Sequence, residues 1–175
     1  IEPKQFASLP GDGRLLATSN RNQTNRPLIW NVRTNERIDL IVDELGNEGN
    51  VEPQDWSSDG QFILLLHIKR AIHQMYRYHV ADRALHKLSA HPSGTFSDAK
   101  FGPDGTILVQ WENSIMPKKF VELNGESGAI ERVIFGPHHD AMPLNRSWRS
   151  VTFASSDGQL IQSWLALPDD SGKRL

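Results

Sequence analysis

The chain has 175 residues, enough for one ordinary domain with a sizeable core. A net charge of −2 offers no basic face for nucleic acid, and no apolar run reaches the ~20 residues that a membrane span needs. Cysteine is absent, which excludes disulfides, thiolate metal sites and a cysteine nucleophile. We therefore expect no nucleic-acid or membrane partner and a cytoplasmic location. The missing signal peptide adds little, because the chain opens on Ile1 rather than Met.

One short motif recurs along the chain with a nearly constant period. An Asp-Gly pair appears three times, at intervals of 47 and 45 residues, as Asp12-Gly13, Asp59-Gly60 and Asp104-Gly105. An aromatic residue precedes each pair: Phe6, Trp56 and Phe101. An apolar run follows each pair, as expected when the pair forms a hairpin turn in which Gly supplies a positive φ. A period of this length is typical of radially repeating all-β folds.

Each repeat contains four strand-like runs. In the first repeat they are residues 4–8, 15–19, 28–32 and 37–42; in the second 51–56, 61–68, 74–80 and 85–89; in the third 96–101, 106–111, 119–123 and 130–135. The run 61–68 is almost continuously apolar and predicts a buried central strand, whereas 85–89 is short and polar, as in an outer edge strand. No stretch shows convincing helical periodicity.

Four-stranded sheets of this kind bury their faces by stacking around an axis as the blades of a β-propeller. We predict an all-β fold with about three blades in residues 1–136, divided near 1–46, 47–92 and 93–136. Trp56 and Phe101 then belong to the core between blades. Three blades alone leave two flat apolar faces uncovered, so we expect self-association or packing against other segments.

The period breaks after residue 135. Residues 137–147 form a loop, and residues 148–175 contain two strands, 148–154 and 160–167, around a fourth turn at Asp157-Gly158. This turn comes 53 residues after the third one, and no third or fourth strand follows the pair. The final unit is therefore a strand pair that leaves the propeller rather than another blade.

Two segments carry a family resemblance. Residues 55–64, DWSSDGQFIL, resemble the Trp-Ser-Pro-Asp-Gly turn of TolB-like propellers and of the prolyl oligopeptidase family of serine peptidases, which includes dipeptidyl and acylaminoacyl peptidases. Ser58 replaces the usual proline, which the third copy keeps as Pro103. Residues 151–168 are similar to the segment that leads these peptidases from the propeller into the hydrolase domain, with Ser163 where glycine is common.

This resemblance implies that the chain is the C-terminal part of a propeller plus the crossover strands towards an α/β-hydrolase domain. The catalytic Ser, Asp and His of such an enzyme would lie beyond Leu175, so we assign no catalytic, cofactor-binding or metal-binding residue and no cofactor. The partners implied are the peptide substrate of the parent enzyme and its C-terminal α/β-hydrolase domain, with the propeller gating peptide access. The alternative is a TolB-like or WD-repeat-like binding module without an enzymatic partner domain.

The remaining motifs have simpler interpretations. Gly125-Glu126-Ser127-Gly128 lacks the Gly-x-Ser-x-Gly spacing of a nucleophile elbow and predicts a hairpin turn. Gly11-Asp12-Gly13 lacks the third glycine of a dinucleotide fingerprint and is also interpreted as a turn. His138-His139-Asp140 is the densest set of candidate ligands, but no third ligand is fixed by spacing; a solvated loop, lining a domain interface, is favoured over a metal or catalytic site. The basic pairs Lys69-Arg70 and Lys118-Lys119 are expected at solvated loop tips.

Overall fold

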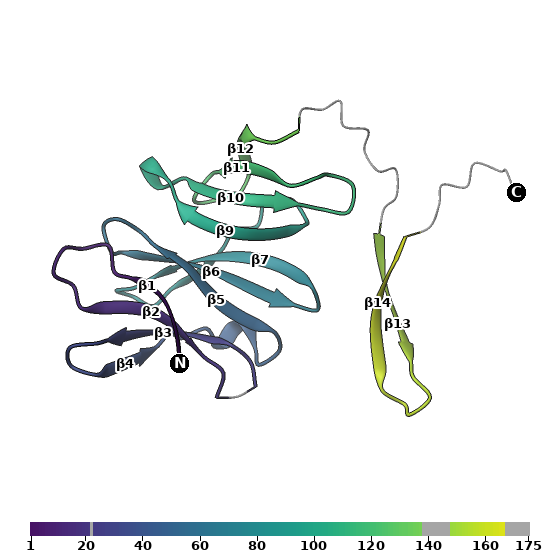
Figure 1. Cartoon of the computed structure of the whole chain (residues 1–175), viewed down its shortest axis with the longest axis horizontal. Helices are drawn as coiled ribbons and strands as arrows, with labels where there is room; N and C mark the ends of the chain where they lie inside the picture. Colours follow the sequence, from purple (N-terminus) through teal and green to yellow (C-terminus); the bar gives the residue numbers. More distant parts are fainter. Residues whose placement is uncertain (22, 138–147, 167–175) are drawn as a thin grey trace, which may run out of the picture.

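The computed structural model describes residues 1–21, 23–137 and 148–166, and most of them lie in strands and tight turns. Three four-stranded antiparallel sheets, named here blades 1 to 3, stack on one another and are followed by a two-stranded hairpin (Figure 1). This arrangement confirms the predicted all-β class. Within the described ranges, no helix is long and apolar enough to cross a membrane.

Each blade pairs its four strands in chain order. Blade 1 contains β1 (Glu2–Phe6), β2 (Arg14–Ser19), β3 (Arg26–Asn31) and β4 (Glu36–Asp39). Blade 2 contains β5 (Asn50–Trp56), β6 (Phe62–Lys69), β7 (Ile72–His79) and β8 (Leu85–Lys87). Blade 3 contains β9 (Thr95–Phe101), β10 (Ile107–Glu112), β11 (Lys119–Leu123) and β12 (Ile130–Phe135), and the hairpin contains β13 (Trp148–Ala154) and β14 (Leu160–Ala166). Two short 3-10 turns, Asp43–Leu45 and Pro103–Gly105, complete the elements.

The strand ends differ from the expected ones mainly in blade 1. β1 begins and ends two residues earlier than predicted, and β4 stops at Asp39 instead of continuing to residue 42. The cause lies in Leu40 and Val42, which are buried against blade 2 instead of extending the edge strand. Packing between blades therefore overrides the local strand preference of this apolar segment.

Two apolar cores join the three blades. The first combines Leu16 and Ile29 of blade 1 with Trp56, Ile63 and Tyr78 of blade 2. The second combines residues of β6 and β7 with residues of β9, β10 and β11: Leu64, Leu66, Met75, Phe96, Ile107, Val109, Trp111, Val121 and Leu123. Phe101 packs partly buried against the second core. The predicted inter-blade placement of Trp56 and Phe101 is therefore confirmed.

The aromatic residue before each turn points towards the preceding blade. Trp56 pairs across the sheet with Ile63, and Phe101 pairs with Ile107, in each case on the face that meets the earlier blade. Phe6 pairs with Leu15 in the same way, but no blade precedes blade 1 in this chain. Phe6 is consequently 63% exposed, whereas Trp56 is 2% exposed.

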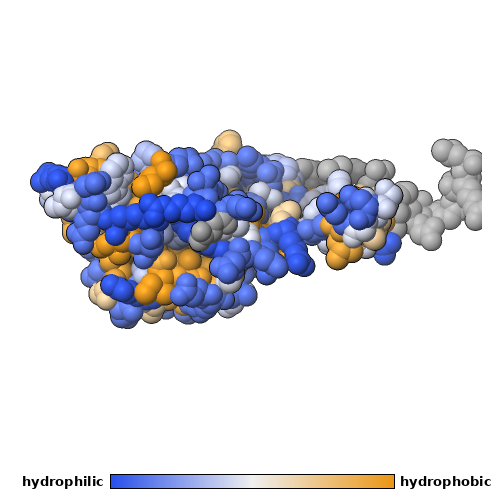
Figure 2. All heavy atoms as spheres, turned by 90° about the horizontal axis from the view of Figure 1, so that it is seen from below, coloured by the Kyte–Doolittle hydropathy of each residue, from blue (hydrophilic) through white to orange (hydrophobic). Residues whose placement is uncertain are grey.

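The two outer faces of the stack differ in character. The free face of blade 1 carries an apolar cluster of Leu15, Ala17 and Leu28, with Trp30 packed against it. Figure 2 views the molecule from the side of blade 1 and shows apolar atoms gathered there and crossed by polar ones.

The opposite face, on blade 3, is mixed. It carries the partly buried Leu108 and Phe120, and their cross-strand partners are Glu122 and Gln110. Glu122 is held in an ion pair with Arg132 at 2.7 Å. The expectation of two apolar faces is thus wrong for blade 3, because polar side chains alternate with apolar ones along β10 and β11.

The terminal hairpin has apolar side chains on both faces. Register pairs Phe153 with Ile161, whereas Leu160 and Trp164 lie on the other side of the two strands. Phe153, Leu160, Ile161 and Trp164 are all more than 40% exposed. A two-stranded hairpin is only marginally stable by itself, so we expect these apolar side chains to pack against another part of the protein.

Candidate functional site

The polar groups of the turn motifs form hydrogen bonds within the turns themselves. At Gly125-Glu126-Ser127-Gly128, Asn124 Oδ1 accepts hydrogen bonds from the Glu126 and Ser127 N–H groups at 3.0 and 2.9 Å and from the Ser127 hydroxyl at 3.1 Å. The Ser127 hydroxyl also accepts the Ala129 N–H at 3.2 Å. This hydroxyl therefore stabilises a turn, which confirms the hairpin interpretation and removes Ser127 as a candidate nucleophile.

The aspartates of the Asp-Gly turns are structural acids. Hydrogen bonds from Arg14 hold the pKa of Asp12 below its usual range, and hydrogen bonds from Ser57 and the Gln61 N–H lower the pKa of Asp59. In the hairpin, the Gln159 N–H and then Ser155 lower the pKa of Asp157 in the same way. Carboxylates held in the ionised form do not serve as proton donors near neutral pH.

The two basic pairs have different environments. Lys69 and Arg70 lie at the exposed β6–β7 turn, where both pair with Glu48, at 3.0 and 3.5 Å. This placement confirms the predicted solvated loop tip. Lys119 is 5% exposed, because β11 begins at this residue inside the sheet, so the same prediction is wrong for Lys119.

The blades have two chemically distinct ends. The three Asp-Gly turns lie together at one end, which we call the turn end (Figure 1). The β2–β3, β6–β7 and β10–β11 connections and the links between blades lie at the opposite end, the loop end. Antiparallel strands in chain order require this separation, since the chain reverses at alternate ends.

A polar group from each inner strand meets at the axis of the stack. Lys100 Nζ donates to Gln5 Oε1 at 2.7 Å and lies 3.4 Å from Asp55 Oδ1, while the Phe101 N–H donates to Asp55 Oδ2 at 2.7 Å. We call Gln5, Asp55 and Lys100 the axial cluster. Each member directly precedes the turn aromatic of its own blade, so the repeat places one polar side chain per blade at this position.

Backbone irregularities accompany the axial cluster. The register of β1 shifts between Pro3 and Gln5, that of β5 shifts between Pro53 and Asp55, and β9 is irregular where it faces residues 108–110 of β10. Bulges of this type re-aim side chains and recur at functional edges. The axial cluster joins three blades and leaves the Lys100 side chain about half exposed.

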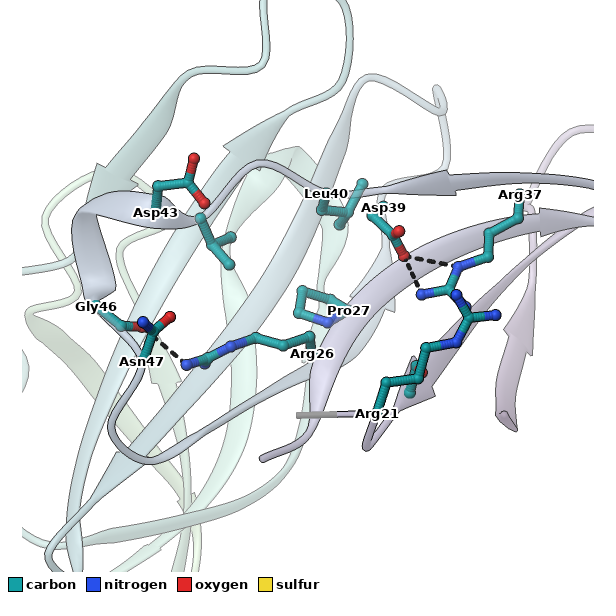
Figure 3. Close-up of a pocket in the computed structure, with 11 residues that line it drawn as sticks. Arg21, Arg26, Pro27, Arg37, Asp39, Leu40, Asp43, Gly46 and Asn47 are labelled. Carbon is teal, nitrogen blue, oxygen red and sulfur yellow. Dashed lines mark hydrogen bonds and ion pairs between the residues drawn. The ribbon is translucent and has the colours of Figure 1, made fainter. Parts of the chain in front are cut away.

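The second candidate site is a pocket at the loop end of blade 1, which we call the arginine pocket. It lies between β2, β3, β4 and the link to blade 2, and three arginines line it: Arg21, Arg26 and Arg37 (Figure 3). Its volume is about 410 Å³, within the roughly 300–1,000 Å³ typical of ligand pockets.

The motif His138-His139-Asp140 lies outside the described residues. In residues 1–21, 23–137 and 148–166, no group of three or more His, Cys, Asp or Glu side chains is arranged to hold a metal ion.

Comparison with known proteins identifies the fold. No family model and no curated protein sequence matches the chain. TolB from Acinetobacter baumannii superimposes on 93% of the chain and 42% of its own length, at 17% identity and a TM-score of 0.60. A puromycin hydrolase matches 93% of the chain and 25% of its own length, at 16% identity and a TM-score of 0.71. A prolyl endopeptidase matches 90% and 23%, at 12% identity and a TM-score of 0.66.

The chain is a partial β-propeller. Its neighbours include propeller domains of TolB and of prolyl oligopeptidase-type enzymes, which bears out the predicted fold of three four-stranded blades followed by a strand pair. The chain spans less than half the length of each of these proteins. At such low identity the likeness establishes the fold, and function has to be argued from the sites.

Neither candidate site was predicted from the sequence. The axial cluster had a detectable signal, since its members occupy one equivalent position in three aligned repeats. The arginine pocket had none, because Arg21, Arg26 and Arg37 come from three separate segments that meet only through sheet pairing.

Proposed function

We propose that this chain is the non-catalytic propeller part of a prolyl oligopeptidase-type serine peptidase and that it limits access of peptides to a hydrolase domain. The observation that carries the proposal is the β13–β14 hairpin, which breaks the blade period and has the sequence pattern of the crossover segment in these enzymes. The parent enzyme would supply the nucleophile, and the propeller would supply shape and binding contacts.

The position of the hairpin supports this proposal. Gln162 Nε2 in β14 donates to the Arg70 carbonyl in the β6–β7 turn at 3.2 Å, which places the hairpin next to the loop end of blade 2 (Figure 1). A catalytic domain that continues from β14 would therefore stand over the loop end, where a peptide entering along the axis would meet it.

The apolar faces of the hairpin support it as well. Phe153 and Ile161 on one face and Leu160 and Trp164 on the other bury no large area against the blades. A strand pair with two exposed apolar faces is stable only when it is packed on both sides. In the proposed enzyme the hydrolase domain provides that packing.

A binding module of the TolB or WD-repeat kind is the competing function. The structural match to TolB and the exposed axial Lys100 favour a propeller that binds partners along its channel. This alternative does not account for a hairpin that departs from the blade period.

Labelling of the natural protein with a fluorophosphonate probe separates the two functions. We expect one serine outside residues 1–175 to be labelled, identified by mass spectrometry of the tryptic peptides, and we expect heat denaturation to abolish labelling. A natural protein that carries the hairpin and shows no labelled serine would overturn the peptidase proposal in favour of the binding module.

A further inference from the structure

The arginine pocket has an excess of unneutralised positive charge. Three arginines and two aspartates, Asp39 and Asp43, line it. Arg37 pairs with Asp39 through Nε at 2.8 Å and through a second, shorter contact from Nη2. Arg26 donates instead to the neutral carbonyls of Gly46 and Gly49, at 2.8 and 3.3 Å. Asp39 therefore neutralises Arg37, whereas the guanidinium group of Arg26 is hydrogen-bonded to carbonyl oxygens rather than to a carboxylate.

One donor in this pocket is buried without a partner. Arg37 Nη1 is shielded from solvent and has no hydrogen-bond partner among the described residues. A buried charged donor left unsatisfied is costly, so such a donor ordinarily takes an ordered water or an ion as its partner.

The geometry around this donor suits an anion. Figure 3 shows the Arg21 side chain reaching from the β2–β3 loop towards the Arg37 guanidinium, while Arg26 extends the other way towards Gly46. Arg21 and Arg37 both line the pocket, so both guanidinium groups contribute positive charge to it. Planar guanidinium donors are also the side chains best matched to carboxylate and phosphate oxygens.

We propose that the arginine pocket binds an anionic group, a phosphate or a carboxylate, between the guanidinium groups of Arg21 and Arg37. The exposed Arg21 guanidinium supplies donors to the oxygens of the anion, and Arg37 and Ser19 line the same pocket. Pro27 and Leu40 give the pocket an apolar side, so a ligand with a small apolar body next to its anionic group fits better than a bare ion. This site does not depend on the proposed peptidase function.

The test is a titration of the isotope-labelled 175-residue chain by NMR at constant ionic strength. Inorganic phosphate is the first probe, and a tripeptide with a free C-terminal carboxylate, compared with its amidated form, is the second. We expect saturable amide shifts confined to residues 19–27 and 37–47. Binding of phosphate alone identifies a tetrahedral oxyanion as the ligand, whereas binding of the free-acid peptide but not the amide identifies a carboxylate.

Three variants locate the binding. Arg21→Gln removes an exposed loop charge and should weaken binding roughly tenfold or more. Arg37→Lys keeps the charge beside Asp39 but removes the planar donor, and should weaken binding several-fold. Arg33→Gln is the matched control, since Arg33 is an exposed arginine at the turn end of the same blade, and it should leave the affinity unchanged.

The result that would overturn the proposal is equally specific. Shifts spread over all basic loops, including Lys69 and Arg70, with equal losses in Arg21→Gln and Arg33→Gln, would show that the chain attracts anions only through its general surface charge. Absence of saturable shifts with both probes would also refute it. Circular dichroism of each variant confirms that a lost signal is not a lost fold.

Discussion

At the scale of single residues, two residues at equivalent positions of the repeat have different roles because the residues around them differ. Phe6 and Trp56 share one position before an Asp-Gly turn, yet Trp56 is enclosed between two blades and donates its indole N–H to the Gly60 carbonyl at 3.0 Å. Arg14 of blade 1 lies over the Trp56 ring, 5.1 Å from its centroid. The contribution of such a residue to stability is therefore set by the adjacent blade and not by its own motif.

Substitution of this aromatic residue should separate the two cases. Trp56→Ala removes a buried side chain and should lower the free energy of unfolding by about 3–5 kcal/mol. Phe6→Ala, at the equivalent but exposed position, should change it by less than about 0.5 kcal/mol. Urea denaturation followed by circular dichroism measures both, and equal losses in the two variants would contradict the inter-blade placement.

A histidine between blades 2 and 3 should make stability depend on pH. Burial lowers the pKa of His73, with smaller opposing effects from its hydrogen bond to Phe96 and from Glu52. His73 Nδ1 lies 3.1 Å from the Phe96 backbone N, which can donate to the neutral ring. In the unfolded chain the pKa is about 6.5, so below this pH the unfolded chain binds more protons than the folded one. Stability is therefore complete above pH ~6.5 and falls as the pH drops towards the lower folded value.

The variant His73→Asn tests this linkage, because its Oδ1 replaces Nδ1 as an acceptor but does not titrate. We expect the urea midpoint of the wild type to fall more than that of His73→Asn between pH 7.5 and pH 5.5. All other side chains are the same in both proteins, so the difference between them isolates His73. Parallel midpoints over this range would show that the burial of His73 has no effect on stability.

At the scale of elements, the inner strands are joined by more than apolar packing. Asp55 of β5 accepts the Phe101 N–H of β9 at 2.7 Å, so a side chain of one blade satisfies the backbone of the next. Lys100 adds a longer, half-exposed contact to the same carboxylate. Because exposed ion pairs contribute little, the bond to the backbone is the stronger part of this connection.

Two variants at the axis should therefore differ. Asp55→Ala leaves the Phe101 N–H without its partner and should destabilise the chain by about 1–3 kcal/mol. Lys100→Met removes the half-exposed ion pair and the exposed hydrogen bond to Gln5, and should cost less than about 1 kcal/mol. Hydrogen exchange provides the local readout: the Phe101 amide should lose protection in Asp55→Ala and keep it in Lys100→Met. An unprotected Phe101 amide in the wild type would refute the bond.

The elements were largely predictable from the sequence, and their contacts were not. The Asp-Gly period and the apolar runs were sufficient to place all four strands of every blade within a few residues, because turn chemistry and strand patterning are local. The end of β4 was missed because Leu40 turns towards another blade. The start of β11 at Lys119 was predicted, but the burial of its side chain was not, because the charge of the Lys118-Lys119 pair favours solvent exposure. The arginine pocket depends on three distant segments and had no local signature.

At the scale of the whole molecule, the outer faces of the stack determine association. Blade 1 presents the 63% exposed Phe6 on its outer face, next to a half-buried Trp30 and an apolar cluster that is itself at most 5% exposed. Exposed apolar surfaces of this kind mark contact sites. A further blade of the same protein or a second copy of the chain would cover it.

The isolated chain should therefore self-associate. Analytical ultracentrifugation should show a sedimentation coefficient that rises with concentration, and Phe6→Glu should suppress that rise. Ile72→Glu is the control, since Ile72 is similarly exposed but lies at the loop end of blade 2. A chain that remains monomeric at all concentrations would contradict this prediction.

The placement of Gln5, Asp55 and Lys100 has a consequence for how such a protein diversifies. Each of these side chains is specified by one sequence column, the residue before the turn aromatic, while the aromatic itself is devoted to packing. Point changes in that column alter the charge at the meeting point of the inner strands one blade at a time. Gln5 and Lys100 can vary with little effect on the fold, whereas Asp55 is constrained, because it also accepts the Phe101 N–H that joins blades 2 and 3.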